Sequence, residues 1–189
     1  MQQIYLDNAA TTPVRPEVEE VMQPYFCEKY GNPSGIYKMA SECRQALETV
    51  RKQIGKTLKV SAEEIYFTSG GTESDNWAIK STAQRLKEKG KHIITSKIEH
   101  HAVLNSCAYL ETQGFEVTYL DVDEWGCVRF DALQRAIRKD TILISIMYAN
   151  NEVGTIQPIG QIGKIAKEND IFFHMDRFPL MLKEKIYIY

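Results

Sequence analysis

Apolar positions along the chain form either helical stripes or short continuous runs. The clearest stripe lies between Tyr37 and about Leu58, where it predicts a first long helix after an N-terminal arm. Its apolar members are Cys43, Leu47, Val50, Ile54 and Leu58.

Five short apolar runs after this helix predict strands. They cover residues 64–68, 92–97, 115–122, 141–150 and 171–176. Helical patterns separate them, the first from about Glu73 and the others over 99–114, 131–140 and 159–170. Strands that alternate with helices predict an α/β fold, in which helices cover both faces of a mostly parallel sheet.

The ends of the predicted strands carry the candidate chemistry. Sheets of this kind bind ligands in the crevice at the carboxyl ends of their strands, so polar residues that follow the strands should share one edge. The groups in question are Ser69-Gly70-Gly71-Thr72, Glu99-His100-His101, Asn150-Asn151-Glu152 and His174-Met175-Asp176.

The stretch "TSGGTESDN" leaves a predicted strand and opens a helix at once. The N–H groups and partial positive charge of a helix N-terminus suit a phosphate, and Gly70 and Gly71 would allow a close approach. The alternative is an N-cap made by Thr72 or Ser74, with Glu73 and Asp75 complementing the helix dipole, and spacing alone leaves both open. Neither G-x-x-x-x-G-K-[ST] nor G-x-G-x-x-G occurs, so a bound phosphate would not be a nucleotide's.

Three further strand-end residues each have a structural and a chemical interpretation. Asp176 ends an apolar strand, where a carboxylate is costly to bury unless it pairs with a cation or caps a turn. His100 is a helix cap or a ring-binding group, and Asn151 is a turn former or a ligand. A phosphate cradle, an imidazole, an amide and a carboxylate on one edge together fit a phosphorylated aromatic cofactor with a basic ring nitrogen. Pyridoxal 5'-phosphate (PLP) has this combination.

Composition and charge narrow the remaining classes. The 189 residues are 43% hydrophobic and 25% charged, and a net charge of -2 without a basic run does not suggest nucleic-acid binding. No apolar run is long enough to span a membrane and no signal-peptide layout is seen, so a cytoplasmic protein is expected. The four cysteines are expected to be reduced thiols, and they form no metal-ligand cluster with the histidines.

Six stretches of the chain resemble a known family. They are "YLDNAATTPVRPEV", "GNPSG", "FTSGGTESDNWAIK", "EHHAVL", "NNEVGTIQPI" and "FFHMD", in this order from Tyr5 to Asp176. They resemble the NifS/IscS-type cysteine desulfurases of the class V aminotransferase group. The resemblance implies a homodimeric, PLP-dependent enzyme of fold type I. Such an enzyme takes sulfur from L-cysteine, leaves L-alanine and passes a persulfide to an acceptor protein, for iron–sulfur clusters or thiolated tRNA.

The resemblance also implies roles for the strand-end residues. Gly71 and Thr72 would hold the cofactor phosphate, which favours the cradle over the plain N-cap. His100 would stack on the pyridine ring and assist proton transfer. Asn151 would bond the ring hydroxyl near the substrate carboxylate, and Asp176 would pair with the pyridinium nitrogen and keep it protonated.

The sequence departs from the family pattern after Asp176. The family continues "HTDAVQ", with a Gln that contacts the cofactor, where this chain has "HMDRFP" and Pro179. The family's Ser-x-His-Lys, whose lysine forms the Schiff base with PLP, is absent, as are the sulfur-accepting Cys loop and the substrate-binding arginine. Neither Lys183 nor Lys185 has the expected neighbours. A product truncated before the Schiff-base lysine, and inactive alone, is therefore expected.

The resemblance predicts three segments and leaves two alternatives open. Residues 1–30 would form an arm belonging to the small domain, 31–176 a partial PLP-binding large domain, and 177–189 an unrelated tail. One alternative is another class V enzyme, such as a selenocysteine lyase or an aminotransferase. The other is a non-catalytic fragment that pairs with a full-length homologue.

Overall fold

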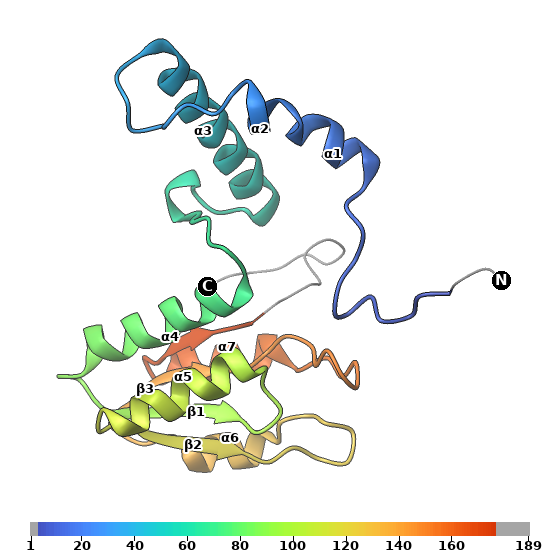
Figure 1. The fold of residues 1–189 in the computed structure, drawn as a ribbon. Coiled ribbons are helices and arrows are strands. Elements are labelled where there is room, and N and C mark those ends of the chain that lie inside the picture. The colour runs from blue at the N-terminus through green and yellow to red at the C-terminus, as the bar shows by residue number, and fades with distance from the viewer. Residues whose placement is uncertain (1–3, 177–189) are drawn as a thin grey trace. The chain divides into compact units, whose positions relative to one another are not determined.

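The computed structural model describes residues 4–176, which divide into two compact units at Phe67 and Thr68 (Figure 1). The predicted tail over 177–189, including Pro179, Lys183 and Lys185, lies outside the described residues. The expected boundary between residues 30 and 31 stays a prediction.

The N-terminal unit consists of helices. They are α1 (Pro16–Met22), α2 (Pro24–Cys27), α3 (Lys38–Leu58) and the short 3-10 helix η1 (Ala62–Glu64). Proline opens both α1 and α2, where its missing N–H is not needed. The apolar stripe predicted α3 to within one residue, and the helix ends at Lys59, which adopts the left-handed conformation with φ 59°.

The strand predicted over 64–68 is wrong. Glu64 belongs to η1, and no strand of the described chain pairs with residues 65–68. Arg51 of α3 instead donates a hydrogen bond to the carbonyl of Ile65, and its guanidinium lies 5.2 Å from the centroid of the Phe67 ring. The aromatic side chains of Tyr66 and Phe67 remain 67% and 47% exposed. An apolar run becomes a strand only where a neighbouring strand completes its hydrogen bonds.

The C-terminal unit is built on a parallel sheet with the strand order β2-β1-β3-β4. The strands are β1 (His92–Ser96), β2 (Glu116–Leu120), β3 (Thr141–Ser145) and β4 (Phe172–His174). Every residue of the central strands β1 and β3 is buried, as continuous apolar runs predict for a sheet covered on both faces. The predicted strand over 141–150 is longer than β3. The apolar run continues past the end of β3 because Ile146 and Met147, which follow the strand, are also buried.

Helices cover both faces of this sheet, which confirms the predicted α/β class (Figure 1). They are α4 (Gly71–Leu86), α5 (His101–Thr112), α6 (Phe130–Ala136) and α7 (Ile159–Glu168). Ile93 packs in a core with residues of α4 and α5, whereas its neighbour Ile94 packs with residues of α6 and α7. Adjacent strand residues point to opposite faces, so the two cores lie on opposite sides of the sheet.

Helix α6 is shorter than the predicted range of 131–140. It ends at Ala136, and the backbone N–H of Arg138 donates to Thr141 Oγ1 at 2.8 Å. The Arg138 guanidinium also binds the carboxylate of Asp140. These local bonds form the turn into β3 in place of another helical turn.

Candidate active site at the carboxyl edge of the sheet

Three of the predicted site residues follow strands of the same parallel sheet. His100 lies after β1, Asn151 after β3 and Asp176 after β4. Because these strands run parallel, their carboxyl ends meet at one edge. The topology therefore brings the three loops to the same edge, as the sequence predicted.

Hydrogen bonds connect these loops to one another. Asn150 Nδ2 donates to the carbonyl of Ile98 at 2.9 Å, which ties the loop after β3 to the loop after β1. The N–H of Tyr148 donates to the carbonyl of Asp176 at 2.7 Å, which ties the β3 loop to the end of β4. The carboxyl edge is thus one connected structure.

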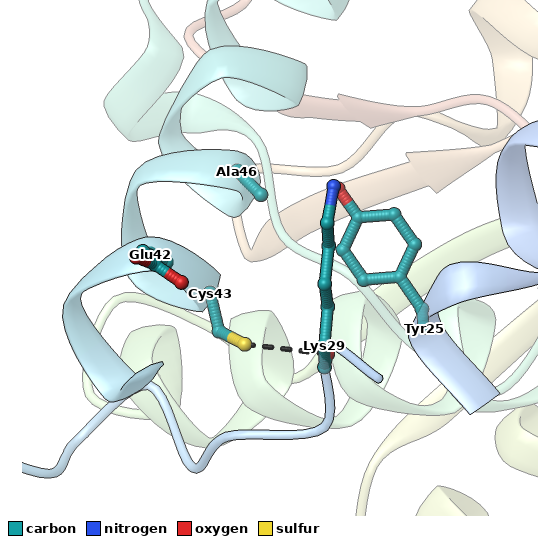
Figure 2. A pocket seen from close by; sticks show the side chains of 5 residues that line it. All are labelled: Tyr25, Lys29, Glu42, Cys43 and Ala46. Atoms are coloured by element: carbon teal, nitrogen blue, oxygen red, sulfur yellow. Dashed lines mark hydrogen bonds between the residues drawn. The ribbon is translucent and has the colours of Figure 1, made fainter. Parts of the chain in front are cut away.

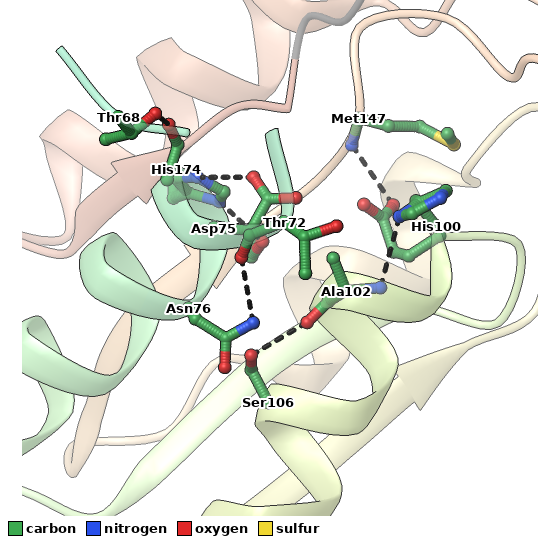
Figure 3. Close-up of polar contacts among 12 residues, drawn as sticks. Thr68, Thr72, Asp75, Asn76, His100, Ala102, Ser106, Met147 and His174 are labelled. Carbon is green, nitrogen blue, oxygen red and sulfur yellow. Dashed lines mark hydrogen bonds and ion pairs between the residues drawn. The ribbon is translucent and has the colours of Figure 1, made fainter. Parts of the chain in front are cut away.

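The N-terminus of α4 reaches the same edge. Asp75 lies in the early part of α4, and its Oδ1 is 3.6 Å from Nε2 of His174 at the end of β4. Figure 3 shows Thr72 beside Asp75, and His100 at the start of α5. The helix that carries Gly71 and Thr72 therefore begins where the strand-end residues gather.

Among the described residues no side chain caps α4, so the alternative of an N-cap made by Thr72 or Ser74 is wrong. Gly70 stands at the cap position, and a Cβ there would meet no atom within 4 Å. The Ser74 hydroxyl instead bonds Thr68 Oγ1 at 2.7 Å. Glu73 accepts a hydrogen bond from the Ser69 N–H at 2.6 Å, and this bond lowers the pKa of the Glu73 carboxyl. Within residues 4–176 the first turn of α4 has no side-chain cap, as an anion site at a helix N-terminus requires.

His100 is the N-cap of α5. Its Nδ1 accepts a hydrogen bond from the N–H of Ala102 at 3.1 Å, while the residue as a whole is exposed (Figure 3). The cap interpretation is therefore confirmed, and it fixes the ring in place. Because Nδ1 accepts, a neutral His100 carries its proton on Nε2.

The turn after β3 is made by Asn150, one residue before the predicted ligand. Asn150 Oδ1 accepts from the N–H groups of Glu152 and Val153, both at 2.9 Å. Asn151 is exposed, and its Nδ2 donates to Glu152 Oε1 at 3.2 Å. The turn-forming role considered for Asn151 thus belongs to Asn150, and the Asn151 side chain lies on the surface of the edge.

Two acidic side chains are buried at this edge, Asp75 at 4% and Glu99 at 5% exposed. Burial raises the pKa of Asp75 to about 7, and the negative charge of Asp176 adds to the shift. Burial also raises the pKa of Glu99 to about 7, although hydrogen bonds from the Ser96 hydroxyl and the Met147 N–H oppose it. Both of those bonds end on Glu99 Oε1, and Oε2 has no hydrogen-bond partner among residues 4–176.

Sequence reasoning missed the burial of these acids. The sequence placed Glu99 and His174 at strand ends but predicted no role for either. It predicted for Asp75 only an interaction with the helix dipole. The available signal was the position of Asp75 four residues before the buried Ile79, on the same face of α4.

A pocket of about 200 Å³ lies in the N-terminal unit (Figure 2). It is lined by Tyr25, Lys29, Glu42, Cys43 and Ala46, and none of the predicted site residues takes part. The Cys43 thiol donates to the carbonyl of Lys29 at 3.3 Å, so its hydrogen is already used. Among the described residues, no imidazole lines this pocket, in contrast to the strand ends.

Comparison with known proteins identifies the family of this chain. The profile of the aminotransferase class-V family matches residues 4–189. The chain belongs to the aminotransferase class-V family. Within this family it is 63% identical, over 173 residues, to the cysteine desulfurase IscS of Methanosarcina thermophila, a match that covers 92% of this chain and 43% of that protein.

Solved structures agree with this class-V assignment. A NifS-like protein matches with a TM-score of 0.90 and 43% identity, over 93% of this chain and 49% of that one. SspA in complex with cysteine matches with a TM-score of 0.87 and 44% identity, over 90% of this chain and 49% of that one. The resemblance to NifS/IscS-type cysteine desulfurases is confirmed. The chain spans less than half the length of the curated relatives it matches.

Class-V aminotransferases of this kind depend on PLP. The residues at the carboxyl edge fit that cofactor in chemistry. The uncapped N-terminus of α4 suits a phosphate, and the exposed His100 imidazole suits the face of an aromatic ring. The Asp176 carboxylate after the end of β4 has the charge that suits a protonated ring nitrogen.

Among the residues that the structure describes, every helix is too short or too polar to cross a membrane.

Proposed function

We propose that the carboxyl edge of this sheet holds PLP in a cysteine desulfurase. The backbone at Gly71 and the hydroxyl of Thr72 bind the phosphate, and His100 lies against the ring. Asn151 bonds the ring hydroxyl, and Asp176 binds the ring nitrogen. The observation that carries the proposal is the meeting of the uncapped α4 N-terminus with the loops after β1, β3 and β4 at one connected edge.

When PLP is bound, its ring accepts electrons from the α-carbon of the substrate. The residues of the chain support that chemistry in two ways. The Asp176 carboxylate keeps a proton on the ring nitrogen, because an adjacent negative charge favours the protonated form. His100, fixed through Nδ1, presents Nε2 as the atom that holds or moves a proton beside the ring.

The proposed reaction removes sulfur from L-cysteine, gives L-alanine, and delivers the sulfur as a persulfide to an acceptor protein for iron–sulfur cluster assembly. The relatives named cysteine desulfurase support this substrate over that of another class-V enzyme. A homo-oligomer in the cytoplasm is part of the proposal. No Ser-x-His-Lys occurs in the 189 residues, so this chain alone is proposed to hold PLP weakly and to be inactive.

The cofactor contacts are tested with pyridoxine 5'-phosphate, which lacks the aldehyde of PLP and so does not react with lysines. Asp176→Asn should weaken its binding roughly tenfold or more, because a charge-assisted hydrogen bond to the ring nitrogen is lost. The measurement is the dissociation constant from isothermal titration calorimetry.

Asp170→Asn is the matched control, since Asp170 precedes β4 at the opposite end of the same strand and pairs with Lys89 on the surface. Its affinity should equal that of the wild-type chain. Equal affinities for all three chains, or no saturable binding by the wild type, would contradict the proposed site.

A further inference from the structure

Polar contacts join α4, β4, β3 and β1 at the carboxyl edge, and Figure 3 shows the first of them, between Asp75 and His174. They begin on α4 with Asp75, whose Oδ1 is 3.6 Å from His174 Nε2 on β4. His174 Nδ1 then lies 2.9 Å from Ser145 Oγ on β3. The Ser145 carbonyl in turn accepts from Thr95 Oγ1 of β1 at 2.9 Å. One helix and three strands are joined in this way.

The contact between Asp75 and His174 is not an ordinary ion pair. Burial raises the pKa of Asp75 to about 7 and lowers the pKa of His174 to about 4, whereas two opposite charges in contact would shift both the other way. The negative charge of Asp176 also raises the pKa of Asp75. His174 is therefore neutral near pH 7. Its Nε2 lies in polar contact with Asp75 Oδ1 at 3.6 Å, longer than a hydrogen bond, and its Nδ1 is within hydrogen-bond distance of the Ser145 hydroxyl.

The position of Asp75 makes it the anchor of the first part of α4. The buried residues of this helix are Asp75, Ile79 and Ala83, so no residue before Asp75 holds the helix in the core. Asp75 lies three residues after Thr72, and His174 lies two residues before Asp176. Their contact therefore joins the element that presents the phosphate-binding backbone to the element that presents the ring-binding carboxylate.

We propose that Asp75 and His174 are positioning residues that lock the beginning of α4 onto β4, and so fix the spacing between the α4 N-terminus and Asp176. This inference rests on the proposed function, because the spacing matters for a ligand that uses both ends. A ligand with a phosphate and a ring nitrogen gains from the correct spacing. A ligand with the ring alone does not.

The test compares pyridoxine 5'-phosphate with pyridoxine, which has the same ring without the phosphate. The wild-type chain should prefer the phosphate ester, and Asp75→Ala should reduce this preference roughly five- to tenfold. Asp75→Asn should restore it to within about twofold, because the amide has nearly the same shape and keeps a polar oxygen in contact with a neutral His174. His174→Ala should reproduce the loss.

Ala83→Gly is the control for general destabilisation, because Ala83 is buried on the same helix and a glycine there weakens the helix without touching the contact. Its preference for the phosphate ester should equal that of the wild type. If Ala83→Gly loses as much preference as Asp75→Ala, or if Asp75→Asn fails to restore it, the positioning role is wrong.

A measurement without ligand separates this inference from the proposed function. In the ligand-free chain, Asp75→Ala should speed amide hydrogen exchange at Asn76 and Trp77, relative to their intrinsic rates, roughly fivefold or more, and leave Ile93 and Ile144 in the core strands unchanged. Unchanged exchange at the start of α4 overturns the inference and leaves the proposed function standing. Failure of the wild-type chain to bind pyridoxine 5'-phosphate overturns the proposed function, and with it the role of the contact in cofactor binding.

Discussion

At the residue scale, the unusual feature of the carboxyl edge is its two buried acidic side chains, Asp75 and Glu99. Glu99 accepts hydrogen bonds through one oxygen from Ser96 and Met147, and in the part of the chain that the structure describes its other oxygen has no partner. Such a group is costly to bury as a carboxylate, so the folded chain favours its protonated form. Glu99 directly precedes His100 in the chain and lies buried at the same edge of the sheet.

Glu99→Gln tests this protonation through stability. The folded-state pKa of about 7 lies above the ordinary value of 4.5, so the stabilising effect of the protonated carboxyl is complete below about pH 4.5 and is lost as pH rises to about 7. Relative to Glu99→Gln, the wild-type free energy of unfolding should fall by about 1.4 kcal/mol for each pH unit between about pH 5 and pH 7, and then level off. Urea unfolding of both chains at several pH values measures this difference.

Glu168→Gln is the matched control, because Glu168 lies on α7 with a side chain that is 60% exposed. Its difference from the wild type should change far less over the same range, since its carboxylate stays in water when the chain folds. A Glu99→Gln difference that is flat from pH 5 to pH 8 would mean that the folded chain does not protonate Glu99.

Sequence reasoning reached some of these residues and not others for a physical reason. His100, Asn151 and Asp176 were identifiable because a parallel sheet sends the residues after its strands to one edge. The burial of Asp75 depends on contact with His174, about a hundred residues away in the chain. A local pattern of polar and apolar positions does not contain that contact.

At the element scale, periodicity located the elements well and their ends less well. Helices α3, α4, α5 and α7 and strands β1 to β4 all lie where stripes and apolar runs predicted them. The prediction of a strand over 64–68 was wrong because an apolar segment forms a strand only when a neighbouring strand pairs with it, whatever its own composition. The apolar runs at β3 and β4 continue past their strands, since the loops of the carboxyl edge are themselves partly buried.

At the scale of the whole molecule, the chain matches less than half of each curated relative, so the activity of the 189 residues is itself a question for experiment. Purified chain mixed with PLP and L-cysteine should release no more sulfide than PLP and L-cysteine without protein. The physical reason is the absence from this sequence of the Ser-x-His-Lys whose lysine the family uses to hold PLP covalently. Sustained sulfide release at many turnovers per chain would contradict that expectation.

The central claim is that the carboxyl edge of the sheet binds both the phosphate and the ring nitrogen of a phosphorylated pyridine. The most direct measurement is a titration of the nitrogen-15-labelled chain with pyridoxine 5'-phosphate, followed by amide chemical shifts. The account predicts saturable shifts at Gly71, Thr72, His100, Asn151 and Asp176, with one shared dissociation constant. Shifts that instead gather around Tyr25 and Cys43 in the pocket of the N-terminal unit, or that leave those five amides unmoved, would contradict it.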